Sequence, residues 1–90
     1  MITRKVITVG LPDSAQVHPR EVFVEAIADG VAAIILVHNH PAGKLEPNPE
    51  ELFITRRLVE AGKLLGIDVL DHVIVTKTGW FSFAKKGLLG

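Results

Sequence analysis

Two histidines, His38 and His40, are separated by one residue and directly follow an apolar segment. If the chain stays extended there, both imidazoles leave the same face of the strand, with Cα atoms roughly 6.5 Å apart. This spacing allows the two rings to share one cation, and imidazole is a common metal ligand. The end of a central strand is also where open α/β sheets often bind ligands. The pair therefore predicts a metal site at the carboxyl end of a strand.

Glu51 is the candidate for a third ligand. A catalytic zinc ion usually has three protein ligands and keeps a position open for water, so two histidines need one further donor. Glu51 lies eleven residues after His40, in the first turn of a predicted helix, and the intervening loop is long enough to bring it back toward the rings. Two imidazoles and a carboxylate suit a divalent cation.

The same residues also have a purely structural interpretation. Asn48, followed three residues later by Glu51, resembles a helix capping box with asparagine in place of serine or threonine. A His-x-His pair also occurs by chance, so either ring could be a turn residue or a hydrogen-bonded group at a strand end. The combination with Asn39, Pro41 and Gly43, and with the acid at a fixed distance, favours the metal site.

The other two histidines favour structural roles. His18 precedes a predicted helix and is expected at the surface or as a capping group. His72 lies within an apolar strand beside Asp71 and is expected to be a hydrogen-bonded structural residue rather than a ligand.

The elements that must position these residues form an alternating pattern. Residues 32–37 have no polar member, as a strand covered on both faces would, and Pro19 and Gly66 mark a helix start and a helix end. The predicted strands are residues 4–10, a central strand at 32–37, 67–76 and an edge strand at 80–83. The predicted helices are residues 19–28 and a second helix that starts within residues 48–51 and runs to 65. A turn at 11–14, which leaves a hairpin open as an alternative, and a loop at 38–48 lie between them. This order predicts an α/β layered domain with a mixed sheet and two main helices.

Composition narrows the class of protein. Ninety residues are room for one domain with one modest core. Ten basic residues balance ten acidic ones, so the net positive charge typical of nucleic-acid binders is absent from the sequence. There is no cysteine, so a metal here must use nitrogen and oxygen ligands. The longest apolar run, residues 31–37, is too short to cross a bilayer, and we expect a cytoplasmic protein that does not associate with membranes.

Several segments together resemble one known family. Residues 38–43, His-Asn-His-Pro-Ala-Gly, resemble the RadC motif His-Asn-His-Pro-Ser-Gly, and residues 17–23, 58–67 and 70–75 are also similar to that family. The resemblance covers most of the chain and implies the architecture of the JAMM/MPN metallopeptidases, which is similar to that of cytidine deaminases. It further implies a single RadC-type domain at residues 1–90 that lacks the N-terminal region of longer members.

The resemblance also implies roles for individual residues. In JAMM/MPN metallopeptidases two histidines and an acid hold zinc, a serine near the acid steadies the tetrahedral intermediate, and an upstream glutamate handles the proton of water. His38 and His40 match the histidines, Asn48 falls at the serine, and Glu51 falls at the aspartate. Glutamate is one methylene longer than aspartate and needs a different rotamer, while asparagine can donate an amide N–H to an oxyanion as a hydroxyl would.

The upstream glutamate of the family falls before Ile2, so we expect this chain to lack it; Glu21 matches a different family position on the first helix. Loss of a general base lowers turnover by roughly 10² to 10⁴ where no other group replaces it. The expected function is therefore an impaired zinc-dependent hydrolase of peptide or isopeptide bonds.

Other functions remain open. The alternative is a non-catalytic domain that binds a protein partner and keeps a vestigial metal site. The RadC name associates the family loosely with DNA repair, but a balanced net charge offers little to phosphates. A zinc deaminase would need cysteines that the chain lacks. An exposed edge strand around Trp80 would permit oligomers.

Overall fold

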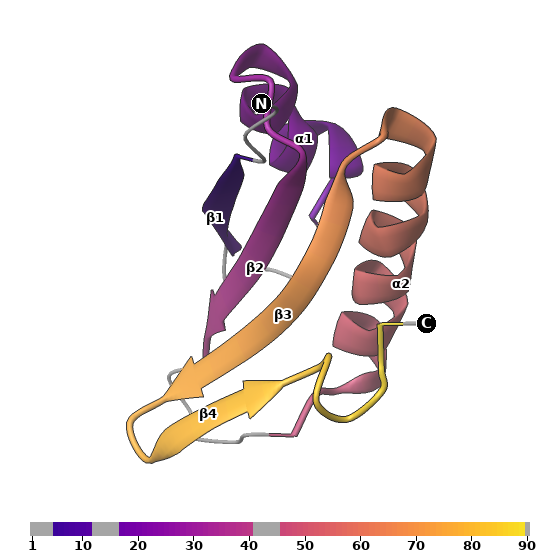
Figure 1. The fold of residues 1–90 in the computed structure, drawn as a ribbon. Coiled ribbons are helices and arrows are strands. Elements are labelled where there is room, and N and C mark those ends of the chain that lie inside the picture. The colour runs from indigo at the N-terminus through magenta and orange to yellow at the C-terminus, as the bar shows by residue number, and fades with distance from the viewer. Residues whose placement is uncertain (1–4, 12–16, 41–45, 90) are drawn as a thin grey trace.

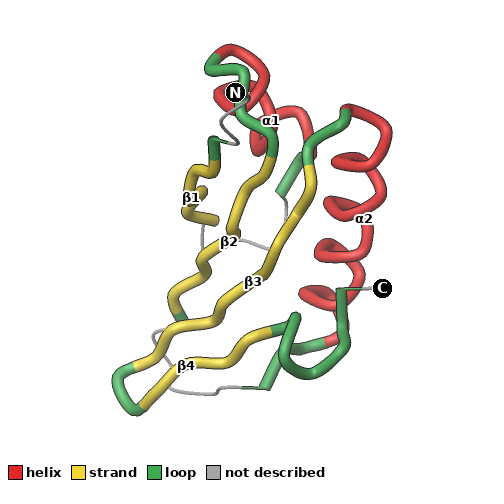
Figure 2. The backbone as a smooth tube through the Cα atoms, viewed as in Figure 1, coloured by secondary structure: helices red, strands yellow, loops and turns green. Residues whose placement is uncertain are grey.

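The protein folds into one mixed sheet with two helices (Figures 1 and 2). The computed structural model describes residues 5–11, 17–40 and 46–89. The elements are β1 Val6–Leu11, α1 Pro19–Ala28, β2 Ala33–Asn39, α2 Pro49–Leu65, β3 Asp68–Thr76 and β4 Gly79–Ser82. The predicted α/β class, with a mixed sheet and two main helices, is confirmed.

The strands lie in the order β1-β2-β3-β4. β1 and β3 both pair in parallel with β2, while β4 pairs antiparallel with β3. The two parallel pairs need crossover connections, and α1 and α2 lie in those connections. Because β1 pairs in parallel with β2, it forms no hairpin with another described strand; the turn predicted at residues 11–14 extends beyond the described residues.

Local sequence signals set the ends of both helices. Pro19 opens α1, and Nδ1 of His18 accepts a hydrogen bond from the Arg20 N–H at 3.1 Å, which confirms the predicted capping group. Asn48 caps α2 at its start. Gly66 ends α2 in the left-handed region, with φ of 74°, where a side chain would be strained.

The core lies between one face of the sheet and the two helices. α2 runs along β3, and α1 packs against both β1 and α2 (Figure 1). The core residues are buried apolar side chains from both helices, from the sheet and from the segments that join them: Leu11, Val17, Val22, Phe23, Ala26, Val31, Ile34, Leu36, Ile54, Leu58 and Ile67. This core fixes the start of α2 relative to the end of β2, which are the two places that carry the candidate ligands.

β2 continues two residues further than the sequence predicted. The loop was expected to begin at His38, but His38 and Asn39 pair with Ile74 and Val75 of β3, and the N–H of His40 donates to the carbonyl of Val75 at 3.0 Å. The strand extends because β3 is nine residues long and supplies partners beyond the apolar run.

β4 forms the predicted edge of the sheet, and Trp80 on it is exposed. Oligomerisation through this edge stays a prediction. Across the described ranges, no helix is both long enough and apolar enough to span a membrane.

Candidate metal centre

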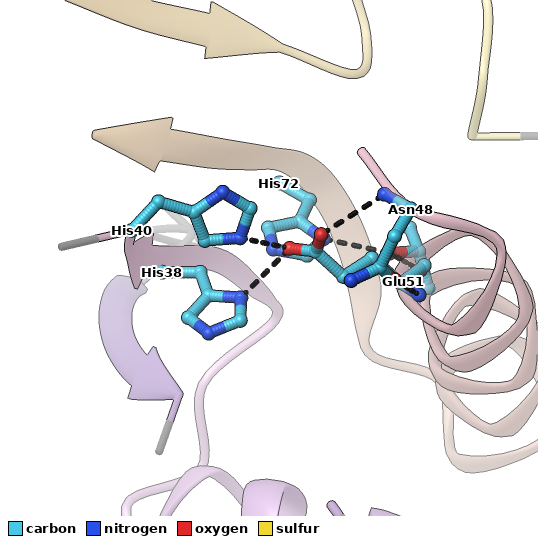
Figure 3. A network of polar contacts seen from close by, with 6 residues as sticks. His38, His40, Asn48, Glu51 and His72 are labelled. Carbon is cyan, nitrogen blue, oxygen red and sulfur yellow. Dashed lines mark hydrogen bonds and ion pairs between the residues drawn. The ribbon is translucent and has the colours of Figure 1, made fainter. Parts of the chain in front are cut away.

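His38, His40 and Glu51 meet between the end of β2 and the start of α2 (Figure 3). The Oε2 atom of Glu51 lies 2.6 Å from Nε2 of His40 and 3.0 Å from Nδ1 of His38. One ligand atom from each residue lies within 4.8 Å of the other two. The sequence predicted that the acid would return to the two rings, and the structure brings all three side chains together. Their role as metal ligands stays a prediction.

The two histidines are positioned by pairing of β2 with its neighbours. His38 lies opposite Leu11 of β1 on one side and Ile74 of β3 on the other, and this pairing sets the face of the sheet from which its side chain leaves. His40 follows the end of the strand and is held by its backbone bond to Val75. The two rings stand edge to face, with centroids 4.8 Å apart and planes at 79°. Both present a nitrogen to the same carboxylate oxygen, as the i and i+2 spacing predicts.

Glu51 is both a capping residue and a partner of the histidines. Its N–H donates to Oδ1 of Asn48 at 2.8 Å, and its Oε1 accepts from the Asn48 N–H at 3.1 Å, which completes the capping box. Its Oε2 is the atom that faces His38 and His40. The two interpretations that the sequence left open therefore hold together, because each uses a different carboxylate oxygen. The carboxylate is buried at a helix N-terminus, where the macrodipole favours a negative charge.

The contact between His38 and Glu51 is close, yet it is not aligned as a hydrogen bond. Nδ1 of His38 is buried and has no partner in hydrogen-bond geometry, although Oε2 of Glu51 lies at 3.0 Å. A buried ring nitrogen beside a carboxylate oxygen, with a second imidazole nitrogen at the same oxygen, is the N₂O donor set that divalent zinc accepts. The residues present thus fit a metal ion, and the group suggests metal binding without identifying the metal.

Asn48 lies at the exposed rim of this group. Its side-chain oxygen accepts the Glu51 N–H, so the amide nitrogen points away from the cap by the geometry of the planar amide. The catalytic role predicted for Asn48 would use that nitrogen, and it stays a prediction.

His72 is a buried structural residue, as the sequence predicted. Its Nδ1 lies 2.6 Å from Oγ1 of Thr55, and its ring stacks on Phe83 with centroids 4.4 Å apart and planes at 7°. Burial, followed by the neighbouring imidazole of His38, lowers the pKa of His72 from 6.5 to about 4, so the ring is neutral at pH 7. His72 does not belong to the group of three ligand atoms, and neither does His18.

Thr55 is the residue at this site that the sequence reasoning missed. It lies one helical turn after Glu51 and is fully buried. The signal was its place on the same face of α2 as Glu51, since residues four apart on a helix are neighbours. Its contact with His72 joins residues seventeen positions apart and depends on how α2 packs on β3.

Comparison with known proteins adds the family context. A family model described as "RadC-like JAB domain" matches residues 1–88. A UPF0758 protein of Methanospirillum hungatei is 52% identical over 89 residues, which are 99% of this chain and 40% of that protein. UPF0758 proteins of Alkaliphilus metalliredigens and Thermotoga maritima are 53% identical over 83 residues and 45% identical over 89 residues; the matches cover 92% and 99% of this chain and 36% and 40% of those proteins. The chain spans about 40% of the length of these curated relatives.

Proposed function

The chain belongs to the RadC-like JAB domain family, and from this membership and the His38–His40–Glu51 group we propose that it is a zinc-dependent hydrolase of peptide or isopeptide bonds. One observation carries the proposal: a single carboxylate oxygen of Glu51 faces a nitrogen of each histidine, at 2.6 and 3.0 Å. The substrate class comes from the family resemblance. The proposal assigns the role of ligand to two neighbouring histidines and to an acid eleven residues after His40, which tertiary packing brings to them.

Each residue of the site has a definite task in this proposal. His38, His40 and Glu51 would hold the metal, and the capping box would keep the Glu51 carboxylate turned toward the rings. When bound, a zinc ion supplies Lewis acidity, which polarises a carbonyl group and makes water more acidic. Asn48, at the exposed rim, would donate its amide N–H to the oxygen that becomes negative during attack on the carbonyl.

A second function is favoured because the cluster of His38, His40 and Glu51 contains a single carboxylate. Both oxygens of that carboxylate already have partners among the described residues. A hydrolase also needs a general base that takes a proton from water. Among the described residues, the cluster of His38, His40 and Glu51 contains no carboxylate other than Glu51 for this task. The second candidate is therefore a non-catalytic domain that retains a metal and binds a protein partner.

Hydrolysis by the zinc-loaded chain tests the first function against the second. The substrates are an unstructured peptide and a lysine isopeptide, and cleavage is followed by mass spectrometry. We expect slow cleavage that disappears in His40→Ala and falls by about 10²-fold in Asn48→Ala, as on removal of an oxyanion donor. Glu50→Gln, which changes the neighbouring exposed acid, is the control and should cleave like the parent.

The result that rejects hydrolysis is equally definite. If the chain binds zinc but cleaves neither substrate, both alone and joined to the remaining length of the Methanospirillum hungatei relative, the partner-binding function is favoured instead.

A further inference from the structure

His72 is held in place on several sides. Its backbone N–H donates to Oδ1 of Asp71 at 2.7 Å, and its carbonyl accepts from the N–H of Phe83 at 3.0 Å. The same Asp71 carboxylate accepts from Oγ of Ser82 at 2.6 Å and from the N–H of Ala84 at 2.9 Å. The ring itself is fully buried and lies flat against Phe83. An imidazole held in this way can keep the side chains that contact it in place.

Thr55 joins this fixed ring to the turn of α2 that carries Glu51. Oγ1 of Thr55 donates its one hydroxyl proton to the backbone carbonyl of Glu51 at 2.7 Å. The same oxygen lies 2.6 Å from Nδ1 of His72, so it must accept from an Nδ1–H there. This pair of bonds fixes the tautomer of His72 and ties the backbone of Glu51 to β3.

The ring of His72 also neighbours the other side of the group. The ring of His38 lies nearly parallel to it, with centroids 6.2 Å apart and planes at 20°. Figure 3 shows His72 between the start of α2 and the histidines at the end of β2. One fully buried side chain thus adjoins both elements that carry the proposed ligands, while it is not itself a member of the group.

We propose that Thr55 and His72 are positioning residues for the proposed metal ligands, with the Thr55 hydroxyl holding the Glu51 turn against the His72 ring and that ring supporting His38. The inference rests on the proposed function and deepens it. Groups that hold metal ligands without touching the metal fix the geometry of the site, and their loss typically lowers metal affinity by roughly 10- to 100-fold.

Zinc affinity of a matched set of variants tests this inference. Thr55→Val keeps the shape of the side chain and removes the hydroxyl, whereas Thr55→Ser retains the hydroxyl. Ile54→Val removes a methylene from the adjacent core residue on the same helix. We expect Thr55→Val to bind zinc at least about tenfold more weakly, as loss of such a supporting group does. Thr55→Ser and Ile54→Val should bind like the parent, whatever small changes they cause in melting temperature.

The outcomes separate this inference from the proposed function. If the parent chain binds no zinc, both fall. If the parent binds zinc and Thr55→Val binds it equally well, the positioning role falls and the ligand assignment stands.

A spectroscopic measurement decides the inference without any substitution. Long-range ¹H–¹⁵N correlation spectra of the metal-free chain at pH 7 should show His72 protonated at Nδ1 and bare at Nε2. A His72 protonated at Nε2 would mean that Thr55 donates to the ring and not to the carbonyl of Glu51, which breaks the proposed tie and overturns the inference.

Discussion

Asn48 and Glu51 bind each other reciprocally across the first turn of α2. Oδ1 of Asn48 accepts from the Glu51 N–H, and Oε1 of Glu51 accepts from the Asn48 N–H. This exchange uses one oxygen of the Glu51 carboxylate and leaves the other, Oε2, directed at His38 and His40. The start of the helix and the candidate metal centre are therefore parts of one arrangement, and a change to the cap should affect both.

Replacement of the cap residue is the first prediction. Asn48→Ala removes the acceptor for the Glu51 N–H and should lower the free energy of unfolding by about 1 kcal/mol, the usual cost of losing a cap. Asn48→Ser retains an acceptor oxygen and should lose less. Chemical denaturation measures both, with Glu60→Ala, on the exposed surface of α2 away from its first turn, as control. Equal stability of Asn48→Ala and the parent would show that the cap contributes nothing to folding.

The second prediction concerns acid and follows from His72. Because burial holds the pKa of His72 at about 4 in the folded chain and 6.5 is its ordinary value, His72 is neutral in both states well above pH 6.5 and has little effect on stability there. Between pH 6.5 and 4 His72 binds a proton in the unfolded chain but stays neutral in the folded chain. The free energy of unfolding should therefore decrease as the pH is lowered through this window, by about 2 kcal/mol at pH 5 from this residue alone.

Denaturation of the parent and of His72→Gln at pH 7 and pH 5, with a chelator present, measures this contribution. The parent should lose more stability than the variant between the two pH values, whatever their difference at pH 7. An equal loss in both proteins would remove His72 as the source of acid sensitivity.

The third prediction concerns the close approach of two backbones at Gly62. A methyl group added there would overlap the carbonyl oxygen of Ile67 and touch the ring of Phe23. Alanine normally stabilises a helix relative to glycine by up to about 1 kcal/mol, but overpacking against rigid backbone costs about 1–3 kcal/mol. Gly62→Ala should therefore lower the melting temperature, while Glu60→Ala, on the exposed surface of α2, should leave it nearly unchanged. A higher melting temperature for Gly62→Ala would refute the close approach.

The elements that carry the site could be predicted from the sequence because their signals are local. Pro19, Pro49 and Gly66 act through backbone constraints that reach only a few residues: α1 begins at Pro19, and α2 begins at Pro49 and ends directly before Gly66. The alternation of strands and helices then predicts the mixed sheet. The length of β2 could not be predicted from local sequence, because pairing of His38 and Asn39 depends on how far β3 extends beside them.

The candidate site shows the same division between local and distant information. The i and i+2 spacing of His38 and His40 indicates that both rings share a face, and the spacing from Asn48 to Glu51 indicates a capping box. Whether Glu51 also reaches the histidines depends on how α2 packs on the sheet, so the sequence left two interpretations open. The contact of Thr55 with His72 depends wholly on that packing, and no local sequence pattern predicts it.

Zinc binding by Glu51→Gln tests the central claim most directly. Glutamine retains an oxygen that can accept from the Asn48 N–H, so the cap persists, but the negative charge beside the two histidines is lost. Isothermal titration of the parent should show one zinc per chain, Glu51→Gln and His40→Ala should bind at least about tenfold more weakly, and Glu50→Gln should bind like the parent. Unchanged zinc stoichiometry and affinity in Glu51→Gln and His40→Ala would contradict the assignment of these residues as ligands.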